Sequence, residues 1–514
     1  MSEPSSQLQS DLPWYRYRTA SSPFFLAKKL YSNKPSTPFR TIAFFPWSDE
    51  SLKTLWGGSL FTPDAFSQWK VMISKWSDAV AVSGDHCVYV FFIDEPRTPM
   101  HISLPQIEST IKPLPTDSIN IAWAIQPGSP LEPLLVFSHM NLLYIYNVEK
   151  KGVSSYLRGH GGAITSIAIH PINTNIFCTT SRDYSVRIYD LNRTLRGTLL
   201  NPPWPPASVP SLAGAPHGLH MSEAEGTGIG QCLVVLMGGR SGGHQAAVLS
   251  AAFHPQLPLI ATCGLDRLVK IWFVPLDTNL NTIRREDKPL FSSSKIHKAC
   301  VLSIAWLGYD MLLTHCTPAL MKTSINQESK DTFIETGQMA IWRWLGIERF
   351  FPSGDHEQIV LRGCASDYQE SVISTLPLPR ENVQTLSTIL HLYQSPTHDP
   401  IVLITRPGSS SILVYNVVHL QPRKPPPFLV DQVDLVESTQ NIHLSGGLGP
   451  GVHLETMPWT LQAGMDDSSQ HKPSDCLMRC AMGKGGTTIV GASTEGTLQI
   501  WKIKRQGNHS STTP

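Results

Sequence analysis

Short apolar runs with the length of β-strands recur along the whole chain and are separated by turns. One kind of run is nearly continuously apolar and occurs at residues 41–46, 119–127, 166–171, 250–255 and 303–308, with a weaker form at 476–486. A second kind carries an aromatic residue and occurs at residues 87–93, 142–148, 185–191, 268–274, 339–345, 412–418 and 497–503. Continuous apolar runs of this length are typical of strands that are buried on both faces. The pattern therefore predicts an all-β protein made of many short strands.

Two segments, residues 159–191 and residues 243–274, align with each other. Both begin with Gly-His, continue through a strand that ends in His-Pro, and close with an aromatic residue six positions after a turn aspartate. His160 precedes Tyr189 by 29 positions, and His244 precedes Trp272 by 28 positions. This spacing is the signature of the WD repeat, in which each repeat of ~40–45 residues forms one four-stranded propeller blade.

The aromatic residue of the second kind of run recurs seven times along the chain. These residues are Phe91, Tyr146, Tyr189, Trp272, Trp342, Tyr415 and Trp501, and successive members are 43 to 86 residues apart. The shortest interval fits one bare blade, so the longer intervals predict insertions. The sequence thus predicts a seven-bladed WD-repeat β-propeller, a closed ring that leaves only short sheet edges. One ring replaces the three domains that a rule of ~150 residues per domain would give.

The propeller is expected over residues 21–507, between flexible tails at residues 1–20 and 508–514. Insertions are expected near residues 198–230, 275–297, 317–333 and 419–472. Residues 198–230 contain six Pro and five Gly, a composition that predicts a mobile surface loop. We expect this loop to separate the third blade from a first strand of the fourth blade that begins at residue 231.

Composition excludes several classes of protein. The net charge is +1 with 16% charged residues, which disfavours direct nucleic-acid binding because phosphate recognition needs clustered Lys and Arg. No signal-like segment opens the chain, and the apolar runs are far shorter than the ~20 residues of a membrane span. The nine cysteines form no C-x-x-C pair, so neither a disulfide framework nor a zinc site is predicted. We expect an intracellular protein without membrane, metal or cofactor.

Two sets of residues resemble catalytic triads, but the blade pattern gives them a structural role. The sets are His160, Thr179 and Asp183, and His244, Thr262 and Asp266. In a WD blade, histidine, threonine and aspartate side chains form a hydrogen-bonded chain with the aromatic ring, here Tyr189 or Trp272, and this chain ties the strands together. A buried aspartate needs such hydrogen-bond partners. We therefore predict a structural blade network, no catalytic residues and no enzymatic activity.

Residues 157–313 resemble one family of WD-repeat proteins, the EED/extra sex combs family. The run of residues 292–313 resembles the Ser-Lys-Ile-His segment before that family's fifth blade, which ends in a Trp-Leu-Gly strand. Residues 243–272 resemble its fourth blade, and residues 157–191 resemble its third blade. The resemblance implies a non-catalytic nuclear subunit of Polycomb repressive complex 2 that acts in transcriptional silencing. Such a subunit holds a helix of an Enhancer-of-zeste-type SET-domain methyltransferase on one propeller face, beside other Polycomb subunits.

On the other face, the family reads trimethyl-lysine of a histone tail in an aromatic cage. The cage positions align here with Arg40 in the first blade, Ile119 in the second, and Val372 and Ile373 in the sixth. Recognition of a methylated ammonium needs several aromatic faces, and none of these four residues is aromatic. The resemblance therefore predicts a scaffold and allosteric subunit whose cage is absent. The alternative is a WD-repeat adaptor in another assembly, such as a ubiquitin ligase or a transport complex.

Overall fold

A computed structural model describes most of the chain. The described residues are 13–17, 21–31, 38–84, 86–104, 119–127, 131–194, 225–238, 242–275, 283–322, 332–351, 369–378, 389–406, 408–420, 458–464 and 475–504. The predicted mobile loop therefore lies largely outside the described residues, as does the predicted tail at 508–514.

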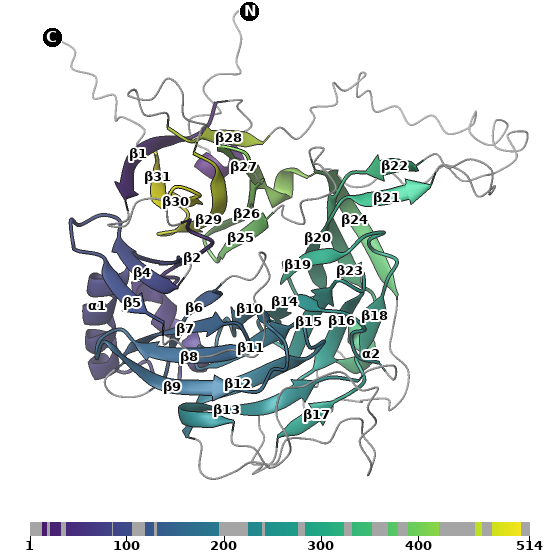
Figure 1. The fold of residues 1–514 in the computed structure, drawn as a ribbon, viewed down its shortest axis with the longest axis horizontal. Helices are drawn as coiled ribbons and strands as arrows, with labels where there is room; N and C mark the ends of the chain where they lie inside the picture. The colour runs from purple at the N-terminus through teal and green to yellow at the C-terminus, as the bar shows by residue number, and fades with distance from the viewer. Residues whose placement is uncertain are drawn as a thin grey trace, which may run out of the picture.

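Seven antiparallel blades of four strands stand around a central axis (Figure 1). Blade 1 contains β2 (Thr41–Phe44), β3 (Ala79–Ser83), β4 (Cys87–Phe92) and β5 (Met100–Ser103). Blade 2 contains β6 (Ile121–Ile125), β7 (Pro133–His139), β8 (Leu142–Asn147) and β9 (Gly152–Arg158). Blade 3 contains β10 (Ile164–Ile169), β11 (Ile176–Ser181), β12 (Val186–Thr194) and β13 (Gly226–Leu236). Blade 4 contains β14 (Val248–Phe253), β15 (Leu259–Gly264), β16 (Val269–Phe273) and β18 (Phe291–Ser293).

The remaining three blades complete the ring. Blade 5 contains β19 (Val301–Trp306), β20 (Met311–Cys316), β23 (Gln338–Trp344) and β24 (Glu370–Pro377). Blade 6 contains β25 (Ile389–Ser395), β26 (His398–Thr405), β27 (Ser411–Asn416) and β28 (Trp459–Gln462). Blade 7 contains β29 (Leu477–Gly483), β30 (Thr488–Ser493), β31 (Thr497–Ile503) and the N-terminal β1 (Phe24–Tyr31).

The first strands of the blades form the inner wall of a closed ring. Each first strand contacts the first strand of the next blade, and β29 of blade 7 contacts β2 of blade 1. The fourth strand of blade 7 comes from the other end of the chain, because β1 pairs antiparallel with β31 from Phe24 opposite Ile503 to Tyr31 opposite Thr497. Figure 1 shows this purple strand beside the yellow strands of blade 7. The predicted seven-bladed propeller is confirmed.

The seven aromatic residues of the repeat all lie on third strands. Phe91, Tyr146, Tyr189, Trp272, Trp342, Tyr415 and Trp501 fall on β4, β8, β12, β16, β23, β27 and β31. Each is less than 9% exposed, because a third strand has a paired strand on both sides and a neighbouring blade on each face. Burial of this kind explains why the aromatic residue marks a blade in the sequence.

Blades 2 and 3 share one continuous sheet of nine strands. The long strand β13 pairs with β12 of its own blade and, through residues 226–228, with β9 of blade 2; its other end pairs with β17 (Arg284–Glu286). Gly226, Gly228 and Gly230 have positive φ angles of 153°, 91° and 94°. A Cβ atom on Gly228 would lie 2.2 Å from the carbonyl oxygen of Ser154. Glycine is therefore required where the two blades meet.

The segment between β2 and β3 carries the largest helical insertion described. It holds η2 (Asp49–Lys53), η3 (Leu55–Gly58) and α1 (Pro63–Trp76). Thr62 caps α1 by accepting a hydrogen bond from the backbone N–H of Ala65, and Pro63 occupies the first turn, an arrangement that favours helix initiation. The helix buries residues spaced three and four apart, Trp69, Met72, Ile73 and Trp76, against blades 1 and 2. The repeat pattern in the sequence did not indicate this insertion.

Within the described ranges, three smaller helices and one hairpin lie outside the blades. The helices are η1 (Trp14–Arg16), α2 (Ile347–Phe350) and η5 (Val417–His419). The hairpin of β21 (Ala319–Lys322) and β22 (Thr332–Glu335) is a separate two-stranded sheet, and Figure 1 shows it projecting from blade 5. None of the helices within the described ranges is long and apolar enough to cross a membrane.

Several predicted boundaries were wrong. Residues 231–236 are the end of β13, the fourth strand of blade 3, and do not begin blade 4. The insertions predicted at 275–297 and 419–472 contain fourth strands, β18 and β28, and the one at 317–333 contains β21. Short outer strands have a solvated edge and no repeated apolar pattern, so their sequence resembles a loop until a neighbouring strand pairs with them.

The N-terminal tail predicted at residues 1–20 was also wrong in part. The Trp14 ring packs on Phe24 with centroids 5.0 Å apart, and the Arg16 guanidinium lies 3.3 Å from the Asp399 carboxylate of blade 6. Residues 13–17 are therefore part of the folded ring.

The joint between blades 2 and 3 predicts a specific sensitivity to substitution. Gly228→Ala combines a positive φ with a backbone collision, so we expect it to lower the free energy of unfolding by about 3 kcal/mol or more. Gly408→Ala is the matched control, because Gly408 also has a positive φ of 73° but a Cβ atom there meets nothing within 4 Å. The control should cost only about 1–2 kcal/mol. Urea unfolding measures both, and equal losses would contradict the role of Gly228 at the joint.

Candidate functional site

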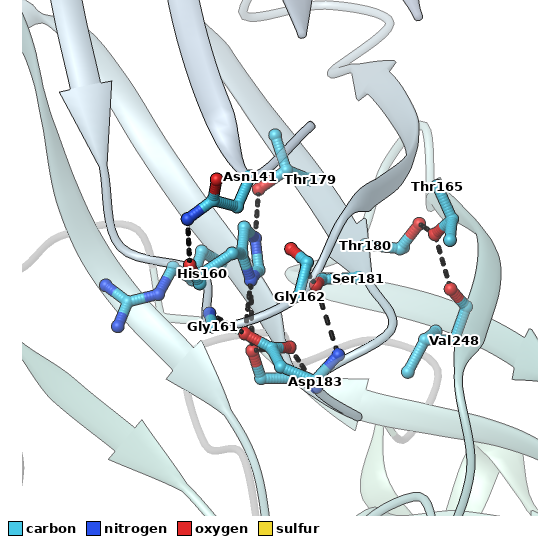
Figure 2. A network of polar contacts seen from close by, with 12 residues as sticks. Asn141, His160, Gly161, Gly162, Thr165, Thr179, Thr180, Ser181, Asp183 and Val248 are labelled. Carbon is cyan, nitrogen blue, oxygen red and sulfur yellow. Dashed lines mark hydrogen bonds and ion pairs between the residues drawn. The ribbon is translucent and has the colours of Figure 1, made fainter. Parts of the chain in front are cut away.

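The histidine of blade 3 lies at the centre of a chain of hydrogen bonds. Nδ1 of His160 lies 2.9 Å from Oδ2 of Asp183, and Nε2 lies 2.7 Å from Oγ1 of Thr179. His160 comes from the loop before β10, Thr179 from β11, and Asp183 from the turn that follows β11. Figure 2 shows the imidazole lying between the hydroxyl and the carboxylate. Tyr189 on β12 also hydrogen-bonds Thr179.

The Asp183 carboxylate is fully satisfied although it is only 1% exposed. It accepts hydrogen bonds from the backbone N–H groups of Gly161 and Ser185 and from the Ser185 hydroxyl. Burial alone would raise the pKa of Asp183, but the neighbouring His160 and the bonds from Ser185 lower it to about 2. The aspartate therefore stays ionised and holds the loop and the turn of blade 3 together.

Blade 4 repeats the same arrangement. His244 bridges Asp266 at 2.9 Å and the Thr262 hydroxyl at 2.8 Å, and Trp272 donates to that hydroxyl from Nε1 at 2.9 Å. Burial lowers the pKa of His244. The pKa of Asp266 is lowered, because hydrogen bonds and the charge of His244 outweigh burial. One threonine oxygen thus links the loop, the second strand and the third strand of the blade.

The burial of these two sets decides their chemistry. Thr179 and Thr262 are 0% exposed, and His160 and His244 are at most 3% exposed. A nucleophile needs access to its substrate and an oxyanion site beside it, and hydroxyls enclosed between strands have no access to an external substrate. The geometry supports a structural role for the predicted blade network.

Blade 5 contains a third, incomplete version that the sequence analysis missed. Nε2 of His297 lies 2.7 Å from Oγ1 of Thr314, and Trp342 donates to the same oxygen at 3.1 Å. Among the residues that the structure describes, no aspartate faces Nδ1 of His297, and this buried nitrogen has no hydrogen-bond partner there. Burial, together with His315, lowers the pKa of His297 to about 3. The signal was present, because His297 precedes its strand by four residues, as His160 and His244 do.

A buried ion pair was also missed. The guanidinium of Arg187 on β12 lies 3.5 Å from the carboxylate of Glu225, and both side chains are at most 2% exposed. Glu225 also accepts from the backbone N–H of Cys232, which anchors the start of β13. A Cβ atom on Gly159 would lie 2.8 Å from Arg187, so the Gly-His glycine of blade 3 makes room for this side chain. Only the fold brings Glu225 beside Arg187, 38 residues away.

The four residues aligned with the family's cage do not form one cluster. Arg40 lies directly before β2, where its carbonyl oxygen accepts a hydrogen bond from Nε of Arg479 at 3.2 Å. Ile119 lies before β6 and is 4% exposed. Val372 and Ile373 lie on β24, the fourth strand of blade 5, so their placement in the sixth blade was wrong. The first strand of blade 6 is β25, whose unrepetitive sequence gave no clear alignment.

The described residues give no metal or disulfide chemistry to the ring. Groups of three His, Cys, Asp or Glu side chains able to hold a metal ion do not occur among them. Their eight cysteines are free thiols, and six of these are buried.

The shared threonine predicts the largest loss in blade 4. Thr262→Val keeps the shape but leaves His244 Nε2 and Trp272 Nε1 without an acceptor, so the free energy of unfolding should fall by about 2–4 kcal/mol. In a Trp272→Phe background the loss should be smaller, because one of the two donors is already gone. Thr332→Val on the exposed β22 is the control and should change stability by less than about 0.5 kcal/mol. A Thr262→Val loss no larger than the control's would contradict the network.

A known sequence family matches the chain in blades 3 and 4, where the His–Asp–Thr arrangement is complete. The family described as WD domain, G-beta repeat, matches residues 151–190 and 230–272. The chain is 28% identical over 154 residues to a Zea mays protein named Polycomb group protein FIE1, covering 30% of this chain and 25% of that protein. It is 27% identical over 194 residues to Polycomb protein EED of Chaetomium thermophilum, covering 37% and 28%. The matched stretches thus span about a quarter of the length of these relatives.

The fold is similar over nearly the whole chain. A chain in a humanized mutant of the Chaetomium thermophilum Polycomb Repressive Complex 2 superimposes with a TM-score of 0.57 and 17% identity, covering 94% of this chain and 99% of that one. The WD-repeat blades, the matched Polycomb sequences and the shared ring agree with the resemblance of residues 157–313. The chain therefore contains WD repeats, and about a third of it is similar in sequence to proteins named Polycomb.

Proposed function

We propose that this protein is a non-catalytic scaffold and allosteric subunit of a histone lysine methyltransferase complex of the Polycomb repressive complex 2 type. The observation that carries the proposal is the sequence match of 154 and 194 residues of this chain to two Polycomb proteins. The partner that performs the chemistry is an Enhancer-of-zeste-type SET-domain methyltransferase, which docks a helix on one propeller face. Other Polycomb subunits and a histone tail are further partners, and the site of action is the nucleus.

The chemistry of the ring supports a scaffold. Its histidine, aspartate and threonine side chains in blades 3 and 4 are enclosed and bonded to one another. A rigid closed ring presents loops and turns at fixed positions, which lowers the entropy lost when a partner binds. The proposed role needs no cofactor and no catalytic residue in this chain.

We propose further that this protein lacks a methyl-lysine cage. Arg40 is a cation, and its carbonyl oxygen is bonded to a second arginine, Arg479. Both guanidinium groups would repel a trimethylammonium ion. Ile119 offers an aliphatic side chain with no aromatic face, and recognition of such an ion depends on several aromatic faces.

The second candidate function is a WD-repeat adaptor in another assembly. It is favoured by the unequal blades, because the complete His–Asp–Thr arrangement described above occurs in blades 3 and 4, while blade 5 lacks the aspartate. Ubiquitin ligases and transport complexes use WD-repeat proteins in this way. The identity of the stable partners separates the two candidates.

Partner identity tests the main proposal. The tagged full chain, purified from cells that express it, should recover a SET-domain methyltransferase in near-equal amount by quantitative mass spectrometry. Tag alone and a tagged unrelated propeller serve as controls. Stoichiometric partners without such a methyltransferase would overturn the proposal and favour the adaptor.

Peptide binding tests the missing cage. In fluorescence polarisation, a histone peptide with trimethyl-lysine should bind no more tightly than the same peptide without the modification. A known reader of trimethyl-lysine, measured in parallel, shows that the peptide is competent. A methyl preference of tenfold or more, which corresponds to about 1.4 kcal/mol, would contradict the prediction.

A further inference from the structure

The turns between second and third strands use an unusual backbone conformation. Blades 6 and 7 place glycine there, Gly408 with φ 73° and Gly496 with φ 71°. Blades 2, 3 and 4 place large side chains in the same left-handed region, Met140 with φ 57°, Tyr184 with φ 72° and Arg267 with φ 66°. Large residues are rare at such angles because the Cβ atom is crowded.

Burial of the side chain in the core offsets the strained φ angle at only one of these three large residues. Met140 is 9% exposed and therefore contributes to the core of blade 2. Tyr184 is 37% exposed and Arg267 is exposed, so neither gains a full core environment in return for its strain. Strained residues that packing does not explain are found preferentially at binding and catalytic sites.

Hydrogen bonds hold in place the two turns that carry these exposed side chains. Asp183 fixes the turn of Tyr184 by accepting from the backbone N–H of Ser185 at 2.9 Å. Asp266 fixes the turn of Arg267 by accepting from the backbone N–H of Leu268 at 3.1 Å. Each of these aspartates is held in turn by the histidine of its blade. The exposed groups are therefore already ordered before any ligand arrives, which reduces the cost of binding.

Apolar and basic groups surround the turn of blade 4. Leu265 is 36% exposed. Its carbonyl oxygen accepts a hydrogen bond from the Cys300 thiol at 3.2 Å, so the loop before β19 lies beside Leu265. Lys295 and Lys298 of that loop are exposed. Lys298 pairs with Glu335 at 2.9 Å.

The aspartates of the two turns and the glutamate beside Lys298 already have partners. Asp183 and Asp266 hold histidines, and Glu335 holds Lys298. Within the part of the chain that the structure describes, Arg267 and Lys295 have no ion-pair partner. The turns of blades 3 and 4 and the loop before β19 together carry an exposed tyrosine, an exposed leucine and two exposed cations without ion-pair partners, and arginine and tyrosine are residue types enriched in binding hot spots.

We propose that the turns of blades 3 and 4, with Tyr184, Leu265, Arg267 and Lys295, form a docking surface for an acidic peptide segment that carries an apolar side chain. Carboxylates of the segment pair with Arg267 and Lys295. Its apolar side chain packs on Tyr184 and Leu265. This inference does not rest on the proposed function, because the charge and strain of these turns are independent of which complex the ring joins.

A pair of synthetic peptides tests the charge of the partner. The probe is a fluorescein-labelled peptide in which Leu and Phe are flanked by glutamates, and its control has lysine at every glutamate. In fluorescence polarisation with the full chain, the acidic peptide should bind and should weaken as salt is raised, since exposed ion pairs are screened. Failure of the acidic peptide to bind, or equal binding of both peptides, would overturn the proposal.

Glycine substitutions separate binding from stability. Tyr184→Gly and Arg267→Gly remove the side chain and relieve the strained φ, so each should leave the Tm equal or higher and weaken acidic-peptide binding at least tenfold. Lys151→Gly is the matched control, because Lys151 is exposed with φ 52° but lies after the third strand of blade 2, at the opposite end of that strand. The Lys151→Gly variant should relieve the strained φ angle in the same way without weakening acidic-peptide binding.

One result of these glycine substitutions would reject the docking surface. If Tyr184→Gly and Arg267→Gly lower the Tm and leave peptide affinity unchanged, the two side chains are structural and the docking surface is rejected. Lys295→Ser provides a further variant at an exposed loop position, and it should weaken the acidic peptide without changing the Tm.

Discussion

Closure of the ring is the constraint on which the other features of this protein depend. Each blade buries apolar side chains against two neighbours, so the first and last blades lack part of their core until they meet. The chain achieves this by pairing β1 with β31, and Nζ of Lys502 in blade 7 lies 2.9 Å from the carboxylate of Asp94, in the loop between β4 and β5 of blade 1. The inner strands then form an uninterrupted wall. Stability is consequently a property of the whole ring more than of any single blade.

Within that ring, the blades are held by unequal means. Blades 3 and 4 use a full chain from histidine to aspartate, threonine and ring, whereas blade 5 leaves one nitrogen of His297 without a partner. Blades 1 and 2 cover the apolar face of α1 and share a mixed aromatic and aliphatic core. Blades 2 and 3 are joined through β13. Different local interactions therefore stabilise blades of the same geometry, and for this reason the repeat is clear in only part of the sequence.

The same polar groups that stabilise the blades also shape the surface. The side chains of Asp183 and Asp266 are at most 7% exposed, but the turns they fix carry Tyr184 and Arg267 into solvent. A network that is remote from solvent can thus order a binding surface a few residues away. This coupling lets a propeller vary its exposed turns while its core contacts stay constant, a property suited to a scaffold that recognises other proteins.

The sequence by itself determined the number of blades, the strand that carries each aromatic residue, and the histidine, threonine and aspartate of blades 3 and 4. These features depend on local periodicity and on residues a fixed distance apart. The tertiary structure decided the rest: the short outer strands β18 and β28, the closing strand β1, the pairing of Arg187 with Glu225, and the place of Val372 and Ile373 on blade 5. Outer strands and buried ion pairs depend on partners far away in the chain, and no local pattern specifies which partner the closed ring will supply.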